Sequence, residues 1–166
     1  LLRESPERIP PSPTLAIAAT SAYFVVGMFS FAVSRDNLSM TTIVGVSLVS
    51  IFIEGGGLFF LLTFKRRTMR YYAALTAIFS CNTLLLIALL PVNYILDKLD
   101  PGLTLDIINS LSLVSLFWWL AIVGFILKKA AEISILQGVV LAFVIELLVA
   151  VTLRSVFSEF ALSTAQ

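Results

Sequence analysis

The stretch IFIEGGGLFF, residues 51–60, places one carboxylate and three glycines inside an apolar run that extends over residues 40–64. This run is longer than the ~20 residues that a helix needs to cross a bilayer. A carboxylate is stable in water but unfavourable in hydrocarbon, so the role of Glu54 depends on the solvent around it. The stretch therefore predicts a transmembrane helix with an acidic residue near its centre.

The composition of the whole chain is that of a membrane protein. Of the 166 residues, 59% are hydrophobic and 13% are charged, against roughly 45–50% and about 25% in soluble domains, and the mean hydropathy is +1.03. We predict an all-α polytopic membrane protein, a bundle of five transmembrane helices that forms a single domain over residues 14–157. The predicted spans are residues 14–33, 40–64, 71–96, 105–127 and 133–157, preceded by a short Pro-rich cytoplasmic lead-in (1–13) and followed by a short outward-facing tail (158–166).

The distribution of Lys and Arg predicts the orientation of the chain. One side carries Arg3, Arg8, Lys65, Arg66, Arg67, Arg70, Lys128 and Lys129, and the other side carries Arg35, Lys98 and Arg154. By the positive-inside rule the N-terminus is cytoplasmic and the C-terminus faces outward. We expect the bacterial inner membrane as the location, with a eukaryotic endomembrane as the alternative.

The basic residues of the second and fourth connectors form a predicted cytoplasmic basic rim. Its members are Lys65, Arg66, Arg67, Arg70, Lys128 and Lys129. We interpret the rim as a determinant of topology. The alternative is that it binds anionic lipid headgroups or an acidic partner surface.

Several function classes are excluded by the residues that the chain lacks. It has no histidine and one cysteine, Cys81, so it cannot supply a bis-His haem site, a cysteine cluster for zinc or iron–sulfur, or a Cys–His nucleophile pair. It has no broad basic face for nucleic acid and none of the hydrolase or nucleotide-binding motifs. We predict a protein without enzymatic activity, cofactor, metal site or nucleic-acid partner.

Polar side chains from all five spans fall near the same depth when each span is centred in the bilayer. They are candidates for an intramembrane polar or ion site: Tyr23, Glu54, Asn82, Ser115 and Glu146, with Ser112 close to Ser115. No Lys or Arg lies at this depth, so removal from water favours the neutral acids, which can donate hydrogen bonds to Asn82, Ser115 or a backbone carbonyl. The first interpretation of this layer is structural, and the second is a proton or cation site.

Two further features of the spans bear on packing. Gly55, Gly56 and Gly57 are predicted close-packing positions, where a neighbouring backbone can approach or the helix can kink. Trp118 and Trp119 point about 100° apart on a helix. One of them can therefore pack inside the bundle while the other meets lipid or a partner, and we expect packing as the role of both.

The final hairpin, FWWLAIVGFILKKAAEISILQGVVLAFVIELL, combines an aromatic-containing helix, Gly124, a basic turn with Lys128 and Lys129, and a last helix opened by small and polar residues. With the short polar start and tight loops, it resembles the Yip1-like family of five-span membrane proteins over residues 14–157. Eukaryotic members are associated with vesicle traffic and small GTPases, usually through a longer N-terminal region than residues 1–13 provide, and bacterial relatives mostly lack an assigned activity. The resemblance implies a scaffold or accessory role and transfers no catalytic residue.

Two functions from different classes follow from these observations. We expect a non-enzymatic integral membrane accessory or scaffolding subunit, which works in the lipid bilayer with a membrane-protein partner or as a homo-oligomer. The alternative is a small proton- or cation-coupled transporter that uses Glu54 and Glu146. An intramembrane enzyme is the third hypothesis, and it lacks a plausible nucleophile and base pair.

Overall fold

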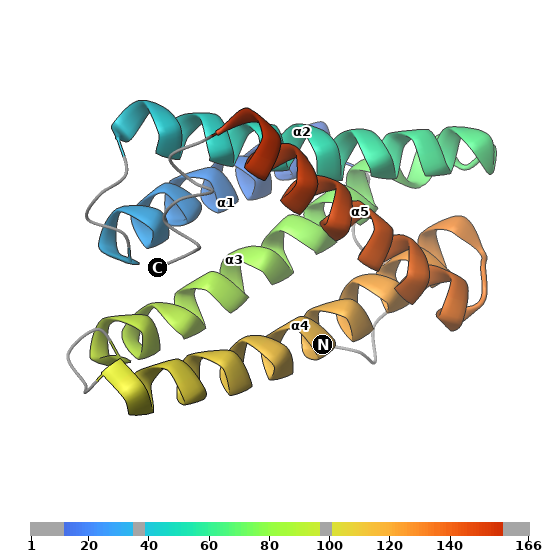
Figure 1. The fold of residues 1–166 in the computed structure, drawn as a ribbon. Coiled ribbons are helices and arrows are strands. Elements are labelled where there is room, and N and C mark those ends of the chain that lie inside the picture. The colour runs from blue at the N-terminus through green and yellow to red at the C-terminus, as the bar shows by residue number, and fades with distance from the viewer. Residues whose placement is uncertain (1–11, 35–38, 97–100, 158–166) are drawn as a thin grey trace.

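The computed structural model describes residues 12–34, 39–96 and 101–157, and all regular elements within them are helices. Figure 1 shows the five long helices: α1 (Pro13–Ser34), α2 (Met40–Phe64), α3 (Tyr71–Leu96), α4 (Pro101–Ala131) and α5 (Ile135–Val156), with a 3₁₀ turn, η2 (Thr68–Arg70), before α3. Each long helix contains a segment long and apolar enough to cross a membrane. The prediction of an all-α, five-helix membrane bundle is confirmed. The predicted C-terminal tail and most of the lead-in lie outside the described residues.

The helix bounds follow the predicted spans closely except around α4. This helix begins at Pro101, before the predicted residue 105, and ends at Ala131, beyond the predicted residue 127. Proline suits the first helical position, because its fixed φ is helical and its missing N–H would have no intrahelical partner there. Lys128 and Lys129 lie in the last turn, where positive charge interacts favourably with the helix dipole.

The helices form two closely packed pairs, α1 with α3 and α4 with α5, and α2 contacts both pairs through α1 and α5. The α2–α3 connection and the α4–α5 turn lie at the same end of the bundle (Figure 1). The main apolar core lies among α2, α3, α4 and α5, and its most buried large side chains are Leu58, Leu62, Phe79 and Leu127. A second, small cluster of Val46, Val149 and Leu153 joins α2 to α5. Many large apolar side chains outside these clusters are exposed, as expected where lipid replaces water.

The α4–α5 pair depends on backbone contact at two glycines. A Cβ added to Gly124 would lie 2.6 Å from Cγ2 of Val139 and 3.0 Å from its backbone nitrogen. A Cβ added to Gly138 would collide with the carbonyl oxygen of Gly124. Backbone atoms cannot move aside as a flexible side chain can, so both positions require glycine for this crossing.

The two connections at this end begin with the same backbone turn. After α2, Arg66 has φ 55°, Arg66 N–H donates to Thr63 C=O (3.0 Å) and Arg67 N–H donates to Leu62 C=O (2.7 Å). After α4, Glu132 has φ 54° and Ile133 N–H donates to Lys128 C=O (3.2 Å). These bonds satisfy carbonyls that a helix end otherwise leaves without partners, in the manner of a Schellman motif. The side chains of Ser134 and Gln137 then form a capping box that starts α5.

We predict that Gly138→Ala lowers the stability of the bundle by about 1–3 kcal/mol, the usual range for overpacking. The added methyl group meets the Gly124 carbonyl oxygen, which belongs to a rigid helix. The midpoint of thermal unfolding in detergent, followed by circular dichroism, measures this change.

Gly56→Ala is the matched control, because a Cβ there meets nothing within 4 Å. Alanine is a better helix former than glycine, so this variant should unfold at the same temperature as the wild type or slightly above it. Equal losses of stability in the two variants would contradict the backbone contact between α4 and α5.

Candidate functional site

Glu54 is the centre of a polar network inside the apolar bundle. It lies midway along α2 and is only 8% exposed. Its Oε1 accepts a hydrogen bond from the Tyr23 hydroxyl of α1 (3.2 Å), and its Oε2 accepts one from Nδ2 of Asn82 in α3 (2.9 Å). Both carboxyl oxygens therefore have a partner, each from a different helix.

The network continues into α4 through Trp119. The indole Nε1 of Trp119 donates to Oδ1 of Asn82 at 2.7 Å. An indole N–H can only donate, so the oxygen of the Asn82 amide must face Trp119 and its nitrogen must face Glu54. Four helices are thus joined by one chain of hydrogen bonds, and every buried side-chain nitrogen and oxygen of the described residues has a hydrogen-bond partner.

The geometry corrects the expected direction of one hydrogen bond. Asn82 was one of three expected acceptors for a neutral acid, but its oxygen accepts from Trp119 and its nitrogen donates to Glu54. The Tyr23 ring stacks on Phe79 with centroids 5.1 Å apart and planes 13° apart. This stacking holds the Tyr23 hydroxyl toward the carboxylate, since the tyrosine ring has few other orientations available in a packed core.

The space beside Glu54 is small. A cavity of about 10 Å³ lies between α2, α3, α4 and α5, and apart from Glu54 its walls are chiefly apolar side chains, such as Leu58, Leu75, Phe79 and Ile145. A cavity needs roughly 10–15 Å³ to hold one water molecule. The cavity is therefore at the lower limit for a single water, and Glu54 is held mainly by protein donors.

Glu146 lies on α5 and is only partly buried. Among the described acidic side chains, Glu54 and Glu132 have hydrogen-bonding or ion-pairing partners, whereas the structure gives Glu146 none. Glu146 is near enough to interact electrostatically with Glu54 and Tyr23. Glu54 and Glu146 therefore lie in the same region of the bundle, as expected from their predicted depth, but no hydrogen bond joins them.

The remaining predicted members of the polar layer do not join the network. Ser115 is partly buried and Ser112 is exposed on α4, and neither makes any of the network's hydrogen bonds. Trp119, one helical turn beyond Ser115, makes the contact with Asn82 instead. Trp119 is partly buried and Trp118 is 54% exposed, so the pair divides between interior and surface, and the expected packing role holds for Trp119 alone.

The three glycines beside Glu54 have unequal roles. A Cβ at Gly57 would lie 3.3 Å from Ile145 of α5, and one at Gly55 would make ordinary contacts with Leu75 and Tyr71 at 3.6 Å. Gly56 is exposed, with open space where its Cβ would be. The close-packing prediction is therefore wrong for Gly56, which points away from the bundle. Among the described glycines, Gly124 and Gly138 are the ones that meet neighbouring backbone, at the crossing of α4 and α5.

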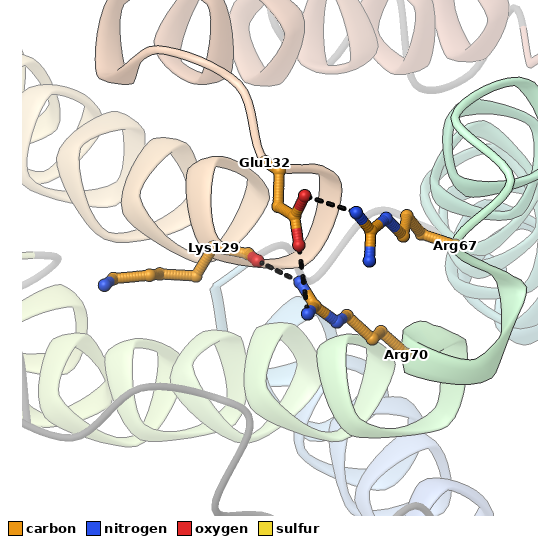
Figure 2. Close-up of polar contacts among 4 residues, drawn as sticks. All are labelled: Arg67, Arg70, Lys129 and Glu132. Atoms are coloured by element: carbon orange, nitrogen blue, oxygen red, sulfur yellow. Dashed lines mark hydrogen bonds and ion pairs between the residues drawn. The ribbon is translucent and has the colours of Figure 1, made fainter.

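The predicted basic rim contains an ionic clasp around Glu132, which the sequence did not identify. Figure 2 shows Arg67 and Arg70 directed at the Glu132 carboxylate, with N–O distances of 2.5 and 3.1 Å. Arg70 also donates to the backbone carbonyl of Lys129 at 3.0 Å, which satisfies an acceptor at the end of α4. The clasp ties the α2–α3 connection to the α4–α5 turn. A signal for it was present in the sequence, because Glu132 is the sole acid in the otherwise basic second and fourth connectors.

The other rim residues make different contacts. Lys65, Arg66 and Lys128 are exposed and have no ion pair with a described residue. The Lys129 ammonium lies 5.9 Å from the centroid of the Phe125 ring, within range of a cation–π contact. The rim therefore combines two arginines paired with Glu132 and three cations exposed to their surroundings.

The described residues contain no group of three or more side chains suited to hold a metal ion. Comparison of the chain with protein-family models, curated proteins and solved structures finds no match.

We predict that Asn82→Ala destabilises the bundle by about 1–3 kcal/mol, because it leaves Oε2 of Glu54 and Nε1 of Trp119 without partners where water cannot replace them. The measurement is the thermal unfolding midpoint in detergent, with Trp fluorescence as a local probe. Glu54→Gln should cost less, since its amide can still accept from Asn82 and can donate to the Tyr23 oxygen.

Ser115→Ala is the control on the same layer, and its unfolding midpoint should stay close to that of the wild type. If Asn82→Ala and Ser115→Ala unfolded at the same temperature, the hydrogen-bonded chain would have no measurable role in stability.

Proposed function

We propose that this chain is a non-enzymatic integral membrane accessory or scaffolding subunit that works with a membrane-protein partner or as a homo-oligomer. This proposal rests on the environment of Glu146. It is a partly buried carboxylate within a membrane-spanning segment, and no described residue pairs with it. Ionisable residues at such positions normally face a polar cavity or pair with another group. A partner helix or a second copy that donates a hydrogen bond would complete the site.

The surface around Glu146 supports the same role. Phe143, Leu147 and Leu148 of α5 are exposed, so an approaching helix could bury apolar surface and a polar contact together. In membranes, helices associate through packing and interhelical hydrogen bonds because lipid is as apolar as the side chains. α5 offers both kinds of contact.

The transporter hypothesis retains one favourable observation, the electrostatic proximity of Glu54 and Glu146. Against it, both oxygens of Glu54 are occupied by protein donors, and the adjoining cavity has a volume of about 10 Å³. A carboxylate enclosed by packed side chains favours a structural role, whereas a relay requires a connected chain of water or titratable groups. The geometry therefore favours the accessory function.

Glu146→Leu is expected to weaken the assembly about threefold to thirtyfold, since an interhelical polar contact in a membrane is worth ~0.6–2 kcal/mol. Leucine keeps the apolar helix surface and removes the carboxylate. Light scattering coupled to size-exclusion chromatography in mild detergent measures the mass of the assembly. Glu132→Gln, which alters an acid at the rim, is the control and should leave the mass unchanged.

Two results would overturn the accessory proposal. One is a wild-type protein that runs as a lone monomer over the whole concentration range. The other is ion-coupled flux in proteoliposomes that Glu54→Gln abolishes while the thermal unfolding midpoint is retained, which would favour the transporter.

The proposal also includes a relationship to the Yip1-like family and an orientation with the N-terminus in the cytoplasm. What supports the resemblance is the α4–α5 hairpin, in which Gly124 lies at the helix crossing and Lys128 and Lys129 lie at the turn. What supports a cytoplasmic N-terminus is the gathering of six basic residues of the described chain at the end of the bundle that holds both connections. Positive charge is enriched on the cytoplasmic side of membrane proteins. The bacterial inner membrane remains the proposed location.

Cysteine labelling tests the orientation. In a Cys81→Ser background, we expect Val156→Cys to react with a membrane-impermeant maleimide on intact cells, and Met69→Cys to react only after permeabilisation. Both positions are exposed in the structure, so both should label once the membrane is opened. The reverse pattern would show that the basic rim faces outward.

A further inference from the structure

A long groove opens between α2 and α5 on the side of the bundle that carries the basic rim. It has a volume of about 760 Å³, within the usual range of ligand-binding sites. α2 contributes Phe60, Leu61 and Phe64, and α5 contributes Leu136, Val140 and Val144. Several of these side chains are exposed, so the groove presents an apolar surface rather than a filled interior.

The groove exists because α2 and α5 diverge. They pack together through Val46, Val149 and Leu153, and they meet again where Ile145 approaches Gly57. Beyond that point the two helices separate toward the rim (Figure 1). The groove therefore closes near the middle of the membrane and opens at the rim.

The mouth of the groove is cationic. Lys65 lies among its lining residues, together with Gln137. Lys65 has no ion pair with a described residue, and the Gln137 amide oxygen is used by the Ser134 N–H (3.1 Å), which leaves the amide nitrogen as a donor. Around this mouth the described rim has six basic side chains and one acid, Glu132. A negatively charged group is the complementary ligand.

We propose that this groove binds one anionic glycerophospholipid, with an acyl chain between α2 and α5 and the phosphate at Lys65. The dimensions favour a lipid over a helix. From Lys65 to Gly57 the groove is eight residues long, or about 12 Å at 1.5 Å per residue, which approaches half of the ~30 Å hydrocarbon core. An acyl chain of one leaflet ends at that depth, whereas a transmembrane helix would have to continue through the contact of Ile145 with Gly57.

The lipid site differs from the partner surface at Glu146 and does not depend on the accessory role. Its test is native mass spectrometry of the delipidated protein titrated with dioleoylphosphatidylglycerol or dioleoylphosphatidylcholine. The two lipids have identical acyl chains, so a difference between them reports the headgroup. We expect the wild type to bind the anionic lipid about fivefold more tightly, the effect of one basic residue near a lipid headgroup.

Variants test the headgroup contact at Lys65 and the apolar groove for the acyl chain separately. Lys65→Gln should remove the preference for phosphatidylglycerol, and it should weaken phosphatidylcholine binding less, because the choline cation of that lipid already offsets the charge of its phosphate. Lys128→Gln is the matched control, because Lys128 is an exposed cation of the same rim that does not line the groove, and it should keep the preference. Val140→Trp should fill the groove and weaken both lipids. Leu136→Trp repeats that test at a second exposed position, so that a folding defect in one variant does not decide the result.

Three results would overturn the proposal. Equal binding of the two lipids by the wild type would mean that the groove has no headgroup site. An equal loss in Lys65→Gln and Lys128→Gln would assign the preference to the diffuse charge of the rim. A dimer that excludes lipid, and that Val140→Trp dissociates, would show that a second copy occupies the groove.

Discussion

The hydrogen bond from Asn82 to Glu54 is the contact on which the arrangement of the first four helices depends. Trp119 can only donate, so it takes the Asn82 oxygen and leaves the Asn82 nitrogen for Glu54. Tyr23 takes the second carboxyl oxygen. Each bond thus determines the role of the next group, and breaking one leaves a polar atom unsatisfied in a medium that contains no water to replace it. This series of hydrogen bonds therefore specifies how α1, α2, α3 and α4 face one another at this depth.

The same requirement for partners shapes the end of the bundle. Arg66 and Glu132 adopt left-handed backbone conformations that let the following N–H groups satisfy helix-end carbonyls. These turns also bring Arg67 and Glu132 together. The two side chains are 44% and 48% exposed, and ion pairs at such exposure contribute about 0–1 kcal/mol. The clasp therefore adds little stability to the two connections that it joins.

The sequence predicted the depth of the polar residues better than the direction in which they point. Hydropathy locates each span, and centring the spans brought Tyr23, Glu54 and Asn82 to one level. Rotation is harder to predict, because lipid-facing and core-facing surfaces are both apolar and the periodic contrast of a soluble helix is absent. Gly56 was therefore expected inside and lies outside, while the contact of Gly124 with Gly138 was not foreseen.

Ser115 and Trp119 show the same distinction on α4. They are four residues apart and share a helix face, so the prediction identified the correct face. The indole reaches Asn82, whereas Ser115 makes none of the network's hydrogen bonds. The distance between two helices decides which side chain is long enough to make a contact across them, and that distance cannot be read from a single sequence.

The groove between α2 and α5 and the lack of a described partner for Glu146 both result from the oblique path of α5. This helix starts against α4, where Gly138 meets Gly124, passes Gly57 of α2 at Ile145, and ends beside α2, where a Cβ on Gly45 would lie 2.7 Å from the Phe157 ring. Because it crosses from one neighbour to the other, it leaves α2 uncovered at the rim and opens the groove there. It also carries Glu146 beside the Glu54 network without joining it. Tyr23, Glu54, Asn82 and Trp119 of the first four helices satisfy one another's polar groups, whereas α5 carries an acid without a described partner and forms one wall of the groove.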